Sequence, residues 1–349
     1  MNQVMDRTDR LNYWMLVAVL TLAGILGTHR AVAQDRWDRV IDLTGRWKFM
    51  IGDKPMWAER YYNDTQWEEV YVPSKWEEEG FHGYDGYAWY RISFNGANLP
   101  NKEESYSLIL GYIDDVDEVY LNGKKIGASG GFPPRYHTAY NALRNYVLPN
   151  ELVDFAGRNV IAVRVFDEGL EGGIIRGNVG IYSNRTDRGL AVNLRGMWDF
   201  YVTGKRAIRM PTIDEQAVAA FVNGSKSNWT KINVPGAWEY QGYHDYDGTA
   251  WYYKEFVIPK QLAGQDLVVV LGKIDDSDRT FLNGKLIGSM TDEWQQLRVY
   301  HISADQYKAG AVNSLVVFVD DPQGFGGIYE GPVGIMKQAD FTRFMRWKN

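Results

Sequence analysis

The feature that most constrains this 349-residue chain is an internal repeat. Tyr84–Tyr90 reads Tyr-Asp-Gly-Tyr-Ala-Trp-Tyr, and Tyr246–Tyr252 reads Tyr-Asp-Gly-Thr-Ala-Trp-Tyr. Neighbouring aromatic, proline and glycine positions match at an offset of 162 residues, and later motifs match at 161 and then 154. Because the offset changes only between motifs, the two copies are predicted to share one fold and to differ in their loops.

The first 33 residues are predicted to be an export signal. Arg7 and Arg10 precede an apolar run from Trp14 to Leu26, and Ala31-Val-Ala33 places small residues where a signal peptidase reads them. The alternative is a membrane anchor, but the run is shorter than the roughly 20 apolar residues of a spanning helix. We therefore expect a periplasmic or extracellular protein with no membrane contact after cleavage.

Composition excludes several classes of protein. The 44 acidic residues outnumber the 38 basic ones, giving a formal net charge of −6, whereas a nucleic-acid or anionic-membrane partner would favour a basic face. The chain has no cysteine, so disulfides, thiol nucleophiles and cysteine metal sites are excluded.

Short segments rich in β-branched and aromatic residues, bounded by turn residues, predict an all-β fold. Asn122-Gly123 and Asn283-Gly284 each separate two such segments, which is typical of a two-residue hairpin turn. Helical periodicity is confined to possible single turns at Tyr140–Leu143 and Asp214–Phe221. Strands spaced in this way, in two copies, predict two antiparallel β-sandwiches.

Several motifs in order resemble the sugar-binding, galactose-binding-like jelly-roll domain of family 2 glycoside hydrolases. They include Gly45-Arg-Trp, Val72-Pro-Ser-Lys-Trp-Glu77, Gly111-Tyr-Ile-Asp-Asp115 and Val119-Tyr-Leu-Asn-Gly-Lys124. The second copy also resembles the β-sandwich domain of sialate O-acetylesterases, in Gly272–Asp278 and Arg298–Ile302. The resemblance implies two tandem galactose-binding-like jelly-roll β-sandwiches, at residues 38–183 and 190–338.

In those enzymes this domain is an accessory to catalysis. The family 2 catalytic barrel needs roughly 250 residues, which the two copies leave no room for, and the Gly-Asp-Ser motif of the esterases is missing. We therefore expect an exported, non-catalytic carbohydrate-binding protein of glycan breakdown, with no cofactor. Its expected partners are an oligo- or polysaccharide and, further, a catalytic hydrolase subunit. The alternative is a β-galactosidase-like hydrolase or acetylesterase accessory subunit, with a site between domains or shared with a partner.

Sugar sites combine flat rings, which stack on a pyranose, with carboxylates that bond its hydroxyls. The repeated loop supplies both kinds of residue, and the resemblance adds the acid that closes a later strand in each copy. The predicted carbohydrate-binding residues are Tyr84, Asp85, Trp89, Asp167, Tyr246, Asp247, Trp251 and Asp321. For Trp89 and Trp251 the alternative is a place in the core.

Clustered acids at Asp114, Asp115 and Asp117, and again at Asp275–Asp278, have two interpretations. Such carboxylates are hard oxygen ligands that suit calcium. More often they accept hydrogen bonds from turn backbone, and no metal is predicted on this ground.

Overall fold

The computed structural model describes residues 37–102, 104–184, 187, 189–205 and 213–348. The chain divides into two units, Met1–Asp38 and Arg39–Asn349. The predicted export signal, residues 1–33, lies outside the described residues, as does part of the predicted boundary near Ser183–Gly189. No helix within the described ranges is long and apolar enough to span a membrane.

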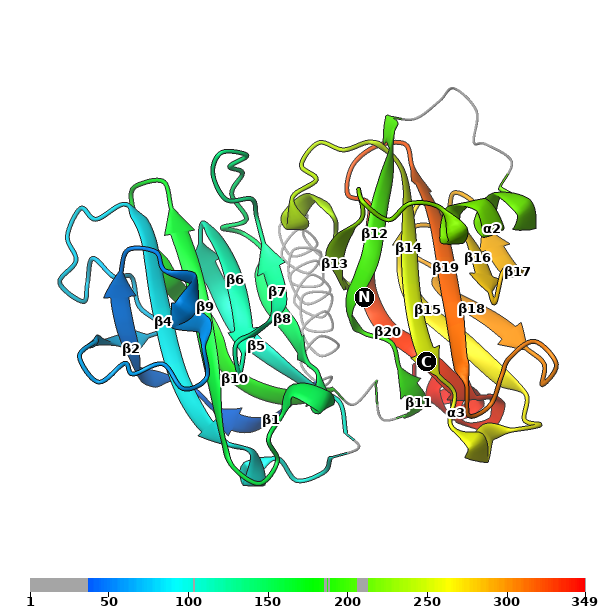
Figure 1. The fold of residues 1–349 in the computed structure, drawn as a ribbon, viewed down its shortest axis with the longest axis horizontal. Helices are drawn as coiled ribbons and strands as arrows, with labels where there is room; N and C mark the ends of the chain where they lie inside the picture. Colours follow the sequence, from blue (N-terminus) through cyan, green and yellow to red (C-terminus); the bar gives the residue numbers. More distant parts are fainter. Residues whose placement is uncertain (1–36, 103, 185–186, 188, 206–212, 349) are drawn as a thin grey trace, which may run out of the picture. The chain divides into compact units, whose positions relative to one another are not determined.

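The first half, residues 37–184, is built from strands and short 3-10 turns (Figure 1). Its strands are β1 (Trp37–Asp42), β2 (Gly45–Ile51), β3 (Glu68–Val72), β4 (Gly86–Asn95), β5 (Tyr106–Asp114), β6 (Val116–Leu121), β7 (Lys124–Ser129), β8 (Leu143–Leu148), β9 (Arg158–Asp167) and β10 (Gly173–Asn184). Its 3-10 turns are η1 (Pro55–Ala58), η2 (Gly96–Asn98) and η3 (Asn150–Leu152).

The second half, residues 189–348, repeats this order of strands and adds two helices. Its strands are β11 (Leu190–Asn193), β12 (Gly196–Lys205), β13 (Thr230–Val234), β14 (Gly248–Val257), β15 (Leu267–Asp275), β16 (Ser277–Leu282), β17 (Lys285–Met290), β18 (Leu297–Ile302), β19 (Val312–Asp321) and β20 (Gly327–Lys337). The helices are α2 (Glu215–Asn223) and α3 (Gln338–Lys348), and the 3-10 turns are η5 (Glu239–Gln241) and η6 (Lys260–Leu262).

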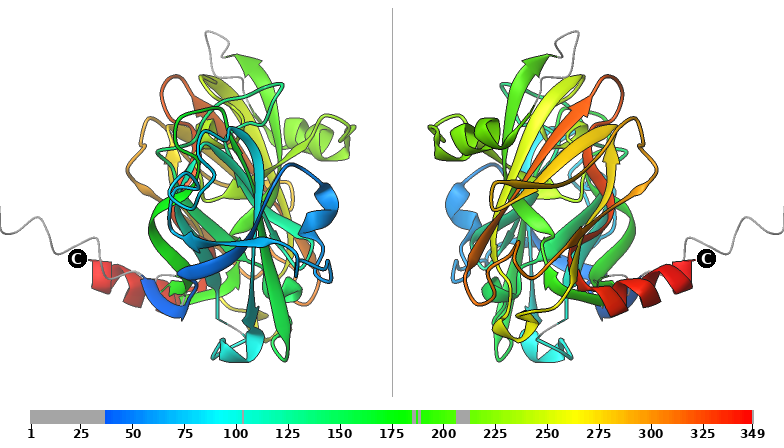
Figure 2. Two further views of the ribbon diagram at one scale, coloured as in Figure 1. Left: turned by 90° about the vertical axis from the view of Figure 1, so that its left-hand side faces the viewer. Right: turned by 90° about the vertical axis from the view of Figure 1, so that its right-hand side faces the viewer.

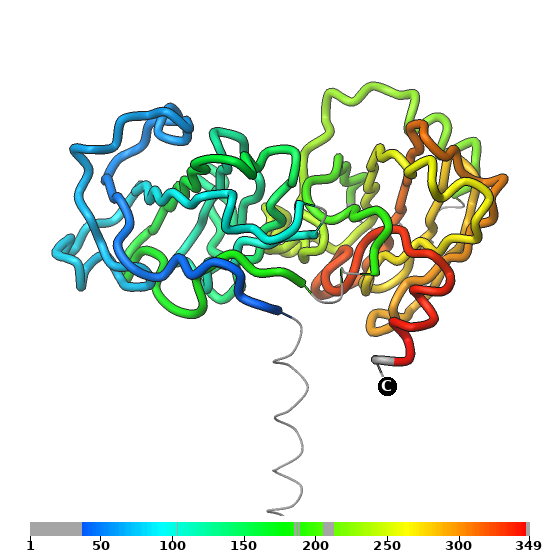
Figure 3. The backbone as a smooth tube through the Cα atoms, turned by 90° about the horizontal axis from the view of Figure 1, so that it is seen from below, coloured from blue at the N-terminus to red at the C-terminus, as the bar shows by residue number. Residues whose placement is uncertain are grey.

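The strands pair into four sheets, and no sheet combines described strands of both halves. The backbone tube runs from blue to green through the first half and from green to red through the second (Figure 3). The first half forms a four-stranded sheet, β1-β10-β5-β8, and a six-stranded sheet, β3-β2-β4-β9-β6-β7. The second half repeats both orders as β11-β20-β15-β18 and β13-β12-β14-β19-β16-β17. The identical strand orders confirm that the sequence repeat is a repeat of structure.

The all-β class is confirmed, but the predicted architecture of two tandem galactose-binding-like jelly-roll β-sandwiches is wrong. The four separate sheets form an arrangement like a four-bladed propeller. The error has a physical origin, because alternation and turn residues locate a strand but do not specify its partners. Strand β10, for example, pairs with β5, which precedes it by more than fifty residues, and such long-range pairing has no local signal.

Both hairpin predictions are confirmed. Asn122-Gly123 joins β6 to β7 with φ values of 51° and 83°, and Asn283-Gly284 joins β16 to β17 with the same two values. Positive φ at both positions is the reason that Asn-Gly is favoured in such turns. Of the two possible helical turns, Tyr140–Leu143 leads into β8 without a helix, whereas Asp214–Phe221 contains the N-cap and most of α2.

Each half buries an equivalent aromatic core. Trp47 lies in the first core and Trp198 in the second, and each indole N–H donates to a backbone carbonyl four residues earlier, at 2.8 and 2.6 Å. Helix α2 packs on the outer face of the second six-stranded sheet (Figure 2). Its Phe221 stacks on Trp251 with ring centroids 4.2 Å apart. Asp214 caps this helix by accepting the Ala217 N–H at 2.8 Å.

A glycine in each half lies directly against a core tryptophan. A Cβ added at Gly172 would lie 2.1 Å from the Trp76 ring, and one at Gly326 would lie 1.9 Å from the Trp238 ring. Alanine at either position is expected to lower the free energy of unfolding by about 1–3 kcal/mol, because a fully buried ring must shift. Denaturant unfolding would measure this loss. Gly189→Ala, where the nearest atom lies 3.7 Å away, is the control, and an equal loss there would contradict the packing explanation.

Candidate functional site

Three aspartates meet at one edge of the first half. Asp114 ends β5, Asp115 follows it, and Asp167 ends β9, and one carboxylate oxygen from each lies within 4.8 Å of the others. In the second half Asp275, Asp276 and Asp321 meet in the same way. These two sets are called the acidic triads. Their recurrence follows from the repeat, because equivalent strand ends bring equivalent acids together.

Strand register places each triad beside the repeated Tyr-Asp-Gly loop. In the pairing of β4 with β9, Gly86 lies opposite Asp167, and in the pairing of β14 with β19, Gly248 lies opposite Asp321. The preceding acids, Asp85 and Asp247, are exposed. The structure therefore brings together four of the predicted residues as two equivalent pairs, each with one exposed and one buried acid.

Burial dominates the electrostatics of the first triad. The Asp167 side chain is fully buried, and neither of its oxygens has a hydrogen-bond partner among the described residues. Burial, followed by the nearby charges of Asp115 and Asp114, raises the pKa of Asp167 to about 7. Burial and the adjacent Asp115 raise the pKa of Asp114 to about 7 as well.

Asp115 behaves in the opposite way. Burial alone would raise its pKa, but donors surround the carboxylate and hold the pKa below its usual value. Its Oδ1 accepts the Thr138 hydroxyl, and its Oδ2 accepts the Tyr136 hydroxyl at 2.7 Å and the Glu168 N–H at 3.2 Å. One carboxylate of the triad therefore has a lowered pKa beside two acids whose pKa is raised to about 7.

The second triad differs in detail. Burial and Asp276 raise the pKa of Asp275 to about 7, and burial raises the pKa of Asp321 to about 6. Asp321 Oδ1 accepts the Gln323 N–H at 3.1 Å, whereas its Oδ2 is buried without a partner within the described ranges. Nearby Glu239 also has its pKa raised to about 7 by burial, and accepts the Gly326 N–H at 3.0 Å.

In each half a buried arginine donates hydrogen bonds to the acidic turn that carries two members of the triad. Arg144 donates to Asp117 at 2.6 Å and to the backbone carbonyl of Asp115 at 2.9 Å. Arg298 repeats this arrangement with Asp278 at 2.9 Å and the carbonyl of Asp276 at 2.7 Å. The third acid of each sequence cluster, Asp117 or Asp278, therefore belongs to a buried ion pair and not to a triad.

The predicted aromatic residues are buried or half-buried. Trp89 and Trp251 are buried, at 0% and 6% exposure, so neither presents a ring face to a sugar. Tyr84 is half-buried against Trp76 and donates its hydroxyl to the Tyr87 carbonyl at 2.7 Å. Tyr246 is also half-buried, and its hydroxyl donates to the Gly204 carbonyl at 2.7 Å. These contacts brace the loops that carry Asp85 and Asp247.

Sequence reasoning missed the membership of the triads. Asp114 and Asp115 were grouped with Asp117 because the three are close in sequence, whereas Asp167 reaches them from a different strand. The repeat carried a usable signal, because Asp167 and Asp321 close equivalent strands and each is followed by a Gly-Gly-Ile motif.

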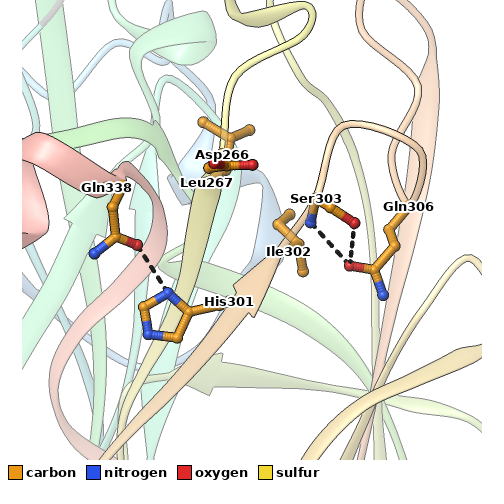
Figure 4. Close-up of a pocket in the computed structure, with 7 residues that line it drawn as sticks. All are labelled: Asp266, Leu267, His301, Ile302, Ser303, Gln306 and Gln338. Carbon is orange, nitrogen blue, oxygen red and sulfur yellow. Dashed lines mark hydrogen bonds between the residues drawn. The ribbon is translucent and has the colours of Figure 1, made fainter.

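A pocket of about 490 Å³ lies elsewhere on the second half (Figure 4). Its lining comes from the β15, β18 and α3 region and consists of Asp266, Leu267, His301, Ile302, Ser303, Gln306 and Gln338. His301 Nδ1 and Gln338 Oε1 lie 2.8 Å apart across it. The lining includes no residue of either triad and none of the residues predicted to bind carbohydrate.

Part of the chain is similar in sequence to a known protein. No family model matches the chain. A protein of Formosa agariphila described as "Putative beta-glucuronidase" is 28% identical over 144 residues, which cover 37% of this chain and 13% of that protein. The matched segment of this chain thus covers about an eighth of that relative's length.

Two solved structures also align, at lower identity. A Bacteroides uniformis β-glucuronidase is 15% identical, with 86% of this chain and 28% of that one covered and a TM-score of 0.37. A β-glucuronidase from glycoside hydrolase family 2 is 14% identical, with 84% and 28% covered and a TM-score of 0.36. At these TM-scores the structural alignments carry no argument of their own. The sequence match relates 144 residues of this chain to part of a protein described as a putative β-glucuronidase.

Proposed function

We propose that this chain is an exported protein that binds carbohydrate without catalysing a reaction, with one binding region in each of the predicted domains, residues 38–183 and 190–338. The observation that carries the proposal is the repeated pairing of an exposed acid with a buried one, Asp85 with Asp167 and Asp247 with Asp321. Exposed carboxylates accept hydrogen bonds from sugar hydroxyls. The acidic surroundings favour a neutral glycan over one rich in uronic acid, because like charges repel.

Two equivalent regions on one chain also suit a polymeric ligand. Each site is expected to be weak alone, and binding of a single polysaccharide at both raises the overall affinity. The role in glycan breakdown, the periplasmic or extracellular location and a catalytic hydrolase partner belong to the same proposal. The description of the sequence relative as a putative β-glucuronidase supports a glycoside as the general class of ligand.

The double variant Asp85→Asn/Asp247→Asn is expected to bind soluble polysaccharide about tenfold more weakly, because hydrogen bonds to charged acceptors are lost at both regions. Titration calorimetry measures the change, and thermal unfolding checks that the fold is retained. Asp245→Asn is the control for loss of an exposed carboxylate, because its side chain is 87% exposed and it removes one of the two charges that the double variant removes. Unchanged affinity in the double variant would remove these two acids from the proposed sites.

One observation favours a second candidate, a glycoside hydrolase or acetylesterase accessory subunit. Each triad combines acids whose pKa lies near 7 with a neighbouring carboxylate, and general acid–base hydrolysis needs such a pair. Release of product from aryl glycosides or acetyl esters, lost in Asp167→Asn or Asp321→Asn, would favour this candidate. The full burial of Asp167 argues against it, because a reacting glycosidic oxygen must reach the acid.

A further inference from the structure

Each acidic triad contains a buried carboxylate with nothing to neutralise it. Both oxygens of Asp167 and Oδ2 of Asp321 are buried without a hydrogen-bond partner among the described residues. Both side chains are fully buried, and their oxygens face the other two acids of their triad. A buried polar group without a partner is costly, and a buried charge is more so. Such a group in a repeated position points to a ligand that the two halves share.

Within the described ranges, no cationic side chain neutralises these buried carboxylates. None of the ion pairs formed within the described ranges uses a carboxylate of either triad. The nearest guanidinium, Arg144, is committed to Asp117 at 2.6 Å and meets Asp115 only through its backbone carbonyl. Arg298 is committed to Asp278 in the same way. Three acids therefore converge in each half while the available arginine is directed elsewhere.

The spacing of the oxygens fits a calcium ion. Calcium takes six to eight oxygen ligands at about 2.4 Å, so two oxygens bound to one ion lie at most about 4.8 Å apart. One oxygen from each acid of a triad lies within 4.8 Å of the others, and the three carboxylates together offer six oxygens. Magnesium, at about 2.1 Å, requires a tighter octahedral set of ligands.

The surroundings of the first triad also suit an ion. The hydroxyls of Tyr136 and Thr138 and the Glu168 N–H donate to Asp115 and orient its carboxylate. Donors that orient ligating side chains in this way are typical of metal sites. We propose that each acidic triad binds one calcium ion, through Asp114, Asp115 and Asp167 in the first half and through Asp275, Asp276 and Asp321 in the second.

The test is the thermal stability of the purified chain after removal of bound ions with a chelator. Calcium at about 100 times its dissociation constant is expected to raise the unfolding temperature by about 5 °C, because it binds only the folded form. Titration calorimetry is expected to give two calcium ions per chain. No shift and no binding heat would overturn the proposal, and a response to magnesium but not to calcium would overturn the choice of ion.

Single variants assign each ion to its triad. Asp167→Asn and Asp321→Asn are each expected to reduce the stoichiometry from two to one, and the double variant to abolish binding. Without calcium these variants are expected to remain as stable as the parent, because each removes a buried charge, so lost binding cannot be confused with unfolding. Asp245→Asn, exposed and outside both triads, is the control for charge. Two ions bound to the double variant would place calcium elsewhere and contradict the assignment.

Discussion

Replacing Arg144 with methionine is expected to lower the free energy of unfolding by about 3–5 kcal/mol, because it leaves the buried Asp117 carboxylate without its cationic partner. The side chains of Arg144 and Asp117 are both fully buried, and their ion pair measures 2.6 Å. The guanidinium also donates to the carbonyls of Ala142 and Asp115, at 2.7 and 2.9 Å. Methionine fills similar volume and replaces none of these donors. Urea unfolding of the purified variant measures the loss.

The second half offers a replicate of this experiment. Arg298→Met removes the equivalent pair with Asp278, also fully buried, and is expected to have an effect of similar size. Arg343→Met is the control, because the Arg343 side chain is 71% exposed and its ion pair with Asp340 is a surface contact. Surface pairs contribute about 0–1 kcal/mol. If all three variants lost the same free energy of unfolding, the buried ion pairs would not be the interactions that stabilise the acidic turns.

In the presence of a chelator, stability is expected to fall as pH rises from about 4 to about 7. Burial raises the folded-state pKa of Asp114, Asp167, Asp275 and Glu239 to about 7 and that of Asp321 to about 6. Their pKa in the unfolded chain is near 4, so in this range the folded protein holds protons that the unfolded chain releases. The stabilisation is complete below pH 4 and is lost as pH passes the folded-state pKa values.

Urea unfolding at a series of pH values tests this prediction. Glu239→Gln is expected to remove part of the slope, because its amide stays neutral throughout. Glu68→Gln, at an exposed position, is expected to leave the slope unchanged. Stability that rises over the same pH range would contradict the prediction, since it would mean that the unfolded chain holds more protons than the folded one.

Much of the fold could be predicted from sequence because its signals are local. The Asn122-Gly123 and Asn283-Gly284 turns were predictable since positive φ at two successive positions favours these residues. The strand segments were visible as short runs of β-branched and aromatic residues. The grouping of strands into four sheets was not predictable, because β-pairing in this chain joins segments far apart in sequence, as β5 with β10 and β15 with β20.

The candidate site could be predicted only in part, for the same reason. Asp85 and Asp167 were selected separately, and their proximity depends on the register of β4 against β9. The choice of Asp117 as a third acid failed because sequence proximity does not reveal the direction of a side chain. Asp117 lies on β6 and accepts from Arg144, whereas Asp115 lies in the turn between β5 and β6 and accepts from Tyr136.

The central claim, that the chain binds carbohydrate without catalysis, is tested most directly by titration calorimetry against a panel of soluble plant, algal and host polysaccharides. Product release is measured in the same samples. We expect saturable heat with a neutral polysaccharide and no released product. Binding is expected to be weaker in Asp85→Asn/Asp247→Asn. Hydrolysis of the ligand, or the absence of binding heat with every polysaccharide in the panel, would contradict it.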